Sequence, residues 1–73
     1  MFKSSLIKRY LFTQINFLEK DLKNFDAELY QLHLDFYNDL SNSQYKSINN
    51  SIMQDKEDTI LLISKLQSLL GEV

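Results

Sequence analysis

The sequence contains no cysteine and no proline, and only one glycine among its 73 residues. Without cysteine, the chain can form neither a disulfide framework nor a thiolate metal site. Proline and glycine are the residues that most often interrupt helices and form turns, so their scarcity leaves room for long helices. The sequence also lacks an apolar run of roughly 20 residues, the length that a membrane-spanning helix needs. A small helical protein without disulfide bonds is expected.

Charge is unevenly distributed, although the net charge is only −2. Residues 1–18 carry Lys3, Lys8 and Arg9 and no acidic residue, whereas residues 19–73 carry five lysines and ten acidic residues. An acidic body argues against nucleic-acid binding, because lysine and arginine must neutralise phosphates. The basic segment 1–10 is interpreted as a flexible or helical lead-in, and it also resembles an amphipathic mitochondrial presequence.

Apolar residues recur at heptad spacing through the first half of the chain. They follow one another at alternating intervals of four and three residues, the pattern of a helix face that packs on another helix. The seam residues are Leu11, Ile15, Leu18, Leu22, Phe25, Leu29, Leu32 and Phe36. This pattern predicts a helix over about residues 5–40, with Ser4 or Ser5 as its N-cap.

The segment Ser41-Asn42-Ser43 is the predicted turn, because short polar side chains bond to nearby backbone amides and favour turns and helix N-caps. A second helix is expected over about residues 44–70, with Gly71 as a left-handed cap. Its inner face is expected to hold Tyr45, Ile48, Ile52, Leu62, Ile63, Leu66, Leu69 and Leu70. A short turn makes neighbouring helices antiparallel, so the predicted fold is all-α, a coiled-coil-like helical hairpin over residues 11–73.

A turn centred on Asn42 also predicts the register, since facing residues then have numbers that add to about 84. The expected pairs are Phe36 with Ile48, Leu32 with Ile52, Leu22 with Leu62, Leu18 with Leu66, and Ile15 with Leu69. In the middle of the seam, Asp55 would face Leu29 and Thr59 would face Phe25. Either Asp55 turns toward water, or this polar centre fixes the register or serves a partner.

A second apolar stripe is expected about 150° away from the seam, at 100° per residue. Tyr30, Leu34 and Tyr37 follow at i, i+4 and i+7, the spacing of a helix that binds in a groove. On the second helix, Met53 and Ile60 lie off the main face. A two-helix hairpin has little core, so these five residues are the predicted partner-binding surface. The alternative is scattered exposed apolar residues, which are normal on protein surfaces.

The sequence offers little catalytic chemistry. His33 is the only histidine, and neither Glu-x-x-His nor His-Glu-x-x-His occurs. Asp26 shares a face with His33 but lies two turns away, and a catalytic histidine needs an orienting carboxylate with a nucleophile or metal close by. There is no glycine-rich phosphate loop. We therefore expect a protein that is not an enzyme and binds no cofactor or metal, with His33 at the surface beside the seam.

The residues flanking the turn have a distinctive arrangement. Leu32-x-x-Asp35 ends the first helix, a short polar link follows, and Gln44-Tyr45 opens the second helix. A middle rich in acids and lysine then leads into Ile60-Leu61-Leu62-Ile63. Over roughly residues 15–70 this pattern resembles the small YscE-like proteins of type III secretion systems. Two features depart from that family: the turn has no glycine, and the basic N-terminal segment is longer.

The resemblance implies a helical hairpin that acts as a co-chaperone in the bacterial cytoplasm. It implies binding to a chaperone with a tetratricopeptide-like fold, the pair keeping a needle subunit soluble before export, a function linked to virulence. Two other interpretations stay open. Two hairpins could form a homodimeric four-helix-bundle regulator, although lysines scattered among acids do not form a stripe for RNA. The basic start MFKSSLIKRYLF would also suit a small mitochondrial or membrane-associated assembly factor.

Overall fold

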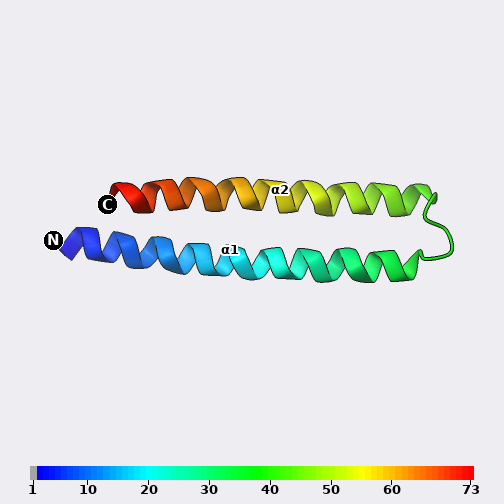
Figure 1. Ribbon diagram of the computed structural model, residues 1–73, viewed down its shortest axis with the longest axis horizontal. Helices are drawn as coiled ribbons and strands as arrows, with labels where there is room; N and C mark the ends of the chain where they lie inside the picture. Colours follow the sequence, from blue (N-terminus) through cyan, green and yellow to red (C-terminus); the bar gives the residue numbers. More distant parts are fainter. Residues whose placement is uncertain (1) are drawn as a thin grey trace.

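The computed structural model describes residues 2–73, with side chains from Ser5 onward, and consists of two antiparallel helices (Figure 1). Helix α1 spans Phe2–Asp35 and helix α2 spans Ser43–Glu72. The molecule is a rod with extents of 57 × 15 × 12 Å. The start of α1 and the end of α2 lie together at one end, and the connection lies at the other (Figure 1). The predicted all-α helical hairpin is confirmed.

The heptad face of α1 packs against α2, as its spacing predicts. The seven seam residues from Leu11 to Leu32 and Phe36, which directly follows α1, are all buried or half-buried. Among the side chains from Ser5 onward, four are buried, with 5–8% of their surface exposed: Leu11, Ile15 and Leu32 from α1, and Ile63 from α2. An uninterrupted apolar pattern at intervals of four and three residues therefore located the inner face of α1 correctly.

Helix α2 packs through a face that holds five of the eight residues predicted for it, namely Tyr45, Ile52, Ile63, Leu66 and Leu70. Its covered residues are Tyr45, Asn49, Ile52, Lys56, Thr59, Ile63, Leu66 and Leu70, again at alternating intervals of four and three. Ile48, Leu62 and Leu69 were expected inside and are exposed. One narrow helix face cannot hold adjacent residues such as Leu62 and Ile63 together. The packed face of α2 therefore follows the heptad spacing, and three of its positions are polar: Asn49, Lys56 and Thr59.

The register also differs from the prediction. The rings of Phe36 and Tyr45 lie 5.7 Å apart between centroids, so the numbers of facing residues add to about 81 rather than 84. The expected pairs of Phe36 with Ile48, Leu32 with Ile52, Leu22 with Leu62, Leu18 with Leu66, and Ile15 with Leu69 are therefore wrong. The observed register places Lys56, not Thr59, opposite Phe25.

The two polar residues at the centre of the predicted seam, Asp55 and Thr59, lie as one of the two alternatives expected, with Asp55 turned toward water. Asp55, expected opposite Leu29, is exposed at the edge of the hairpin. Thr59 is half-buried, and its hydroxyl donates to the carbonyl of Asp55 at 2.8 Å. The threonine thus satisfies its hydroxyl within its own helix, which allows its methyl group to remain in the seam.

Helix α1 ends at Asp35, earlier than the expected end near Leu40. The amide of Tyr37 donates to the carbonyl of Leu34 at 3.4 Å, and that of Asp39 donates to Phe36 at 2.9 Å. These hydrogen bonds join residues three apart, as in a 3₁₀-helix or turn, and not four apart as in an α-helix, so the α-helix ends here. The connection consequently covers residues 36–42 and is centred before Asn42, which accounts for the shifted register.

Asn42 is the N-cap of α2. Its Oδ1 accepts a hydrogen bond from the backbone amide of Gln44 at 2.8 Å, and its Nδ2 donates to Asp39 at 3.1 Å. The first bond satisfies one of the amide groups that the first turn of a helix leaves without an intrahelical partner. The predicted helix start within Ser41-Asn42-Ser43 is confirmed.

Two predicted helix caps are wrong. Helix α1 begins at Phe2, so neither Ser4 nor Ser5 precedes its first turn, and the basic lead-in is helical from Phe2 onward. Gly71 lies inside α2 and does not have a positive φ, so it is not a left-handed cap. Within residues 2–73, neither helix contains an apolar stretch long enough to span a bilayer.

Candidate protein-binding surface

All five residues predicted to bind a partner are exposed. The exposed fractions are 68% for Tyr30, 48% for Leu34, 69% for Tyr37, 49% for Met53 and 46% for Ile60. Each side chain is therefore accessible to another molecule. The five residues do not form a single stripe, however, because they belong to three parts of the hairpin.

One part is centred on Lys56. This residue follows Met53 by three positions and precedes Ile60 by four, so the three side chains are neighbours on α2. The Nζ of Lys56 lies 2.6 Å from Oδ1 of Asp26 on α1. The lysine side chain is 29% exposed and the aspartate 61%, so the aliphatic part of Lys56 covers the seam while its ammonium group reaches the edge. This pair marks one edge of the hairpin, which we call the Lys56 edge.

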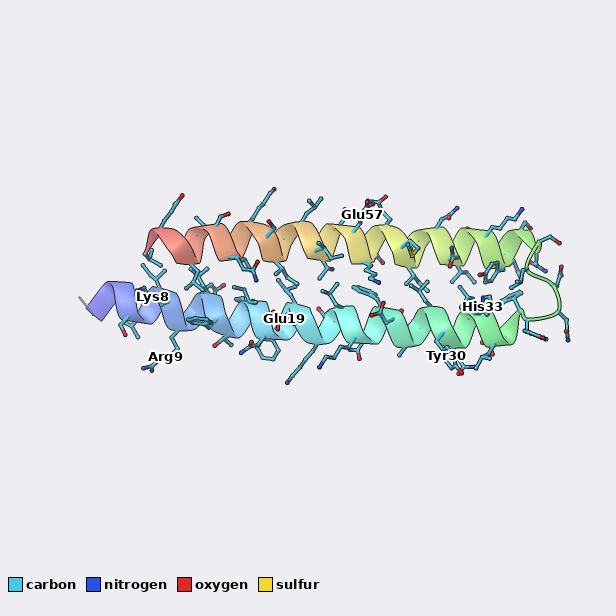
Figure 2. The ribbon with its side chains drawn as sticks, viewed as in Figure 1. Lys8, Arg9, Glu19, Tyr30, His33 and Glu57 are labelled. Carbon is cyan, nitrogen blue, oxygen red and sulfur yellow. The ribbon has the colours of Figure 1, made fainter. Side chains whose placement is uncertain are left out.

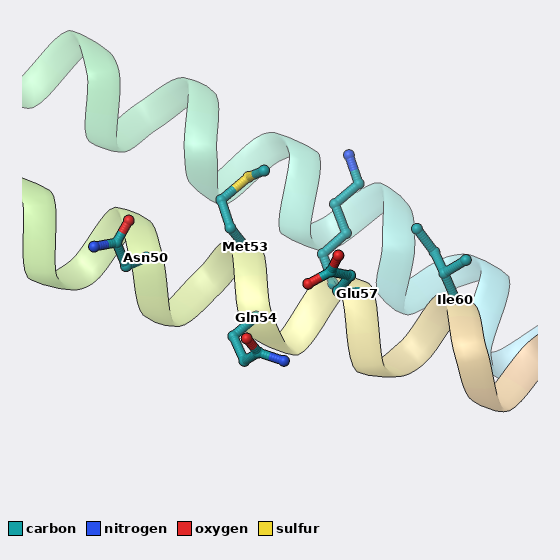
Figure 3. A pocket seen from close by; sticks show the side chains of 6 residues that line it. Asn50, Met53, Gln54, Glu57 and Ile60 are labelled. Atoms are coloured by element: carbon teal, nitrogen blue, oxygen red, sulfur yellow. The ribbon is translucent and has the colours of Figure 1, made fainter.

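Met53 and Ile60 line a shallow hollow at the Lys56 edge, with a volume of about 390 Å³. The other lining residues are Asn50, Gln54, Lys56 and Glu57. Figure 3 shows Met53 and Ile60 pointing toward α1, whereas Gln54 points to the opposite side of α2. An apolar partner side chain could contact Met53 and Ile60 here, with Lys56 and Glu57 providing polar groups at the rim.

Tyr30 lies on the same side of the hairpin as this hollow. It follows Asp26 by four residues and precedes His33 by three, so it shares their face of α1. Both of those residues contact α2, Asp26 through Lys56 and His33 through Tyr45. Figure 2 shows Tyr30 at the outer side of α1, away from α2. The sequence-predicted residues that the structure brings to one broad surface are therefore Tyr30, Met53 and Ile60.

Leu34 and Tyr37 are placed differently. Leu34 is two residues from Leu32 and two from Phe36, which puts it on the side of α1 opposite the seam. Tyr37 follows the end of α1 and belongs to the connection, so it is not the third member of a helical stripe. The predicted i, i+4, i+7 spacing is therefore wrong for Tyr37, because α1 ends before reaching it.

Several residues relevant to binding did not follow from apolar content alone. Asn49, Lys56 and Thr59 occupy seam positions of α2, and Ile48, Leu62 and Leu69 are consequently displaced to the surface. Extending the four-three spacing from Tyr45 through the polar residues would have identified both sets. On α1, Lys20 lies 5.9 Å from the ring centroid of Phe17, so an exposed ring there is partly covered by a cation.

His33 lies beside the seam and is exposed. Its Nδ1 is 3.4 Å from the hydroxyl oxygen of Tyr45, and the two rings meet edge to face with centroids 6.4 Å apart. Figure 2 shows His33 between the two helices near the connection. This contact joins the helices next to the turn. Among residues 5–73, no three histidine, aspartate or glutamate side chains are grouped so that they could hold a metal ion.

Comparison with known proteins assigns this chain neither to a family nor to a known fold. No family model, curated protein or solved structure matches this chain.

Proposed function

We propose that this chain is a small helical adaptor, a cytoplasmic co-chaperone that binds a tetratricopeptide-like chaperone. Together the two proteins would keep a type III secretion needle subunit soluble before export. The observation that carries the proposal is the apolar surface that the hairpin leaves uncovered. Among the described side chains, four apolar residues are buried, whereas sixteen large apolar residues are exposed. More apolar side chains are thus available to a partner than are kept inside.

The total accessible surface supports the same proposal. The chain exposes 5838 Å², whereas a compact monomer of 8.7 kDa would expose about 4,700 Å². The difference of about 1,100 Å² exceeds the roughly 800 Å² that each partner contributes to a standard protein interface. A second protein could therefore cover an interface of ordinary size and leave the hairpin with a surface typical of its mass.

A helical-repeat chaperone suits the shape and chemistry of this surface. Repeat proteins stack helix pairs and present long concave surfaces, which match a rod better than they match a sphere. Tyrosine and methionine are enriched in interface cores, and Tyr30 and Met53 are both exposed. A partner that binds only the folded hairpin would also stabilise it, by about 2.7 kcal/mol at a free concentration of 100 times Kd.

The test is a pair of leucine substitutions on opposite sides of the hairpin. Leu34→Glu places a charge on the outer side of α1, one helical turn from Tyr30 of the proposed surface. Co-expression with the tetratricopeptide-like chaperone of the same organism should then give no co-purification. Leu61→Glu is the matched control, because Leu61 is also exposed but lies on the outer side of α2, two residues from Thr59 and from Ile63. Circular dichroism should show equal helicity in both variants. Retention of the chaperone by Leu34→Glu would remove the proposal.

A second readout tests the needle subunit itself. Purified needle subunit should stay in the supernatant after centrifugation when both the chaperone and the hairpin are present. It should pellet as polymer when Leu34→Glu replaces the wild-type hairpin. If the chaperone alone keeps the subunit soluble to the same extent, the hairpin has no role in that step.

The uncovered surface would also suit a second hairpin, which is the homodimeric four-helix-bundle alternative. That assembly predicts a sedimenting mass of two chains in the absence of any other protein. In the co-chaperone proposal the chaperone replaces any such self-association. Sedimentation equilibrium of the purified chain, with and without the chaperone, separates the two functions.

A further inference from the structure

A second uncovered apolar surface lies outside the residues assigned above. Ile48, Leu62 and Leu69 on α2 are 44%, 46% and 49% exposed. Their separations are whole heptads, so they lie in one line along the helix, with Asp55 filling the remaining position of that line. Leu62 follows Thr59 by three residues and precedes Leu66 by four, which places the line directly beside the seam. The line is therefore an edge of the hairpin rather than its outer back.

This line runs along the edge opposite the Lys56 edge. On α1, Asp26 follows Leu22 by four residues, whereas Glu28 follows Phe25 by three, so the two acids flank the seam on different sides. Asp26 pairs with Lys56 across one edge. Since the helices are antiparallel, the other side of α1 faces the Ile48–Leu69 line of α2. Glu28 and its heptad neighbours Asp21 and Asp35 belong to that side.

The resulting edge combines an apolar row with a row of carboxylates, and we call it the acidic edge. Its exposed residues are Asp21, Glu28 and Asp35 on α1, and Ile48, Asp55, Leu62 and Leu69 on α2. No lysine or arginine occupies a position in either row. Among residues 5–73, the side-chain ion pair is that of Lys56 with Asp26, on the other edge. Asp35 accepts a hydrogen bond from Nε2 of Gln31 at 2.8 Å, which leaves its charge unbalanced.

We propose that the acidic edge is the docking surface for one amphipathic helix whose polar face is basic. Leucine-like side chains of that helix would pack on Ile48, Leu62 and Leu69. Its lysine or arginine side chains facing α1 would pair with Asp21, Glu28 and Asp35, completing a three-helix bundle. This inference concerns a different surface from Tyr30, Met53 and Ile60, and it does not rest on the proposed co-chaperone function.

The carboxylates of the acidic edge decide which of the conceivable partners fits this surface. A second copy of the hairpin docked through the same edge would bring the same carboxylates face to face, and juxtaposed like charges oppose association. A neutral helix would cover the apolar row but leave the carboxylates partly desolvated and unpaired. A basic amphipathic helix satisfies both rows.

The probe is a pair of synthetic peptides with identical leucine faces. Each has about 24 residues, enough to follow the roughly 32 Å between Ile48 and Leu69 at 1.5 Å per residue. One peptide carries lysine beside the leucines and the other carries glutamate. Fluorescence anisotropy with the full chain should show binding of the lysine peptide at least tenfold tighter than that of the glutamate peptide. The affinity should fall as salt screens the exposed charges.

Variants of the two edges locate the binding. Leu62→Gln/Leu69→Gln should weaken lysine-peptide binding at least tenfold, whereas Met53→Gln/Ile60→Gln on the Lys56 edge should change it less than twofold. If the leucine variant loses helicity by circular dichroism, the variant Asp21→Asn/Glu28→Gln decides the question. It removes charge from exposed positions and should weaken binding at least fivefold.

Three results would overturn the inference. The two peptides could bind equally well, or the decisive variant of the acidic edge could bind the lysine peptide as tightly as wild type. The third is self-association, in which the wild-type chain sediments as a dimer and Leu62→Gln/Leu69→Gln converts it to a monomer. If that variant is not folded, Asp21→Asn/Glu28→Gln takes its place in this experiment. That result would identify a second copy as the occupant. None of these outcomes depends on the chaperone test with Leu34→Glu.

Discussion

Two leucines on α1 show how strongly position determines the contribution of a side chain. Leu32 is 8% exposed in the seam, and Leu34, two residues later, is exposed on the opposite side. We predict that Leu32→Ala lowers the free energy of unfolding by about 2–4 kcal/mol, because it removes buried methyl groups and leaves a cavity. Leu34→Ala should lower it by less than about 0.5 kcal/mol. Urea unfolding followed by circular dichroism measures both. Equal losses would mean that the seam is not the core.

Lys56 is the residue whose burial is hardest to reconcile with its charge. It occupies a seam position opposite Phe25, and its pair with Asp26 is largely open to water, where such pairs contribute about 0–1 kcal/mol. Lys56→Met should therefore raise the free energy of unfolding by about 1 kcal/mol, through added apolar burial. Asp26→Asn, the control, should change it by less than about 0.5 kcal/mol. A large loss in Lys56→Met would show that the ion pair holds the helices together.

The start of α2 depends on a single side chain, Asn42. Replacing it with alanine removes the acceptor for the Gln44 amide and the donor to Asp39, and should cost about 1 kcal/mol. Ser41→Ala is the matched control in the same connection. The Ser41 hydroxyl donates to Asp39 at 3.3 Å and caps no helix, so its loss should cost less than about 0.5 kcal/mol. Thermal unfolding of the two variants, measured side by side, compares the two contributions.

The two helices differ in how far their sequences predicted their packing. The inner face of α1 could be read from its spacing because every heptad position is apolar. In α2, Asn49, Lys56 and Thr59 interrupt the apolar seam. Ile48 and Leu62 lie next to the seam, and their apolar side chains led to the prediction that they are on the inner face. Apolar content and heptad spacing disagreed there, and packing followed the spacing. Composition alone could not reveal this, because the aliphatic part of lysine and the methyl group of threonine can occupy a seam.

The connection was harder to predict than the helices, and this affected the candidate surface. The heptad pattern of the first half of the chain continues to Phe36, and Leu40 lies one turn further, which suggested a helix that ends near residue 40. The three-residue bonds around Leu34 and Asp39 end it sooner. The exposure of Tyr30 and Leu34 followed from their distance from the seam of α1, and that of Met53 and Ile60 from their position off the predicted inner face of α2. The position of Tyr37 did not, because it depends on where α1 ends, and local hydrogen bonds of the connection determine that point.

The whole molecule is one line of packed layers rather than a compact core. Its radius of gyration is 16.8 Å, whereas a compact domain of this length would have about 11 Å. Every layer is therefore close to solvent, and each contacts only the layers next to it. Stability in such a rod should vary along its length with the apolar content of the local layers, as it does between neighbouring units of repeat proteins.

This variation predicts an unusual pattern of amide hydrogen exchange. Leu11, Ile15 and Ile63 are buried toward the end with the two termini, and Leu32 is buried near the connection. Between them, Thr59 and Lys56 interrupt the apolar seam, and local opening is easiest where few apolar side chains are buried. The amides of Leu18 and Leu66 should therefore exchange more slowly than those of Phe25 and Lys56, although they lie nearer the open end.

The alternative is simple fraying, in which protection falls steadily from the connection to the termini. Thr59→Val distinguishes the two, because it removes a hydroxyl from the polar middle at nearly constant volume. If the polar layers determine local opening, this variant should slow exchange around Phe25 and Lys56 and leave the rate near Leu11 unchanged. A uniform change of the exchange rates along both helices would instead mean that the two helices separate and unfold in one cooperative step.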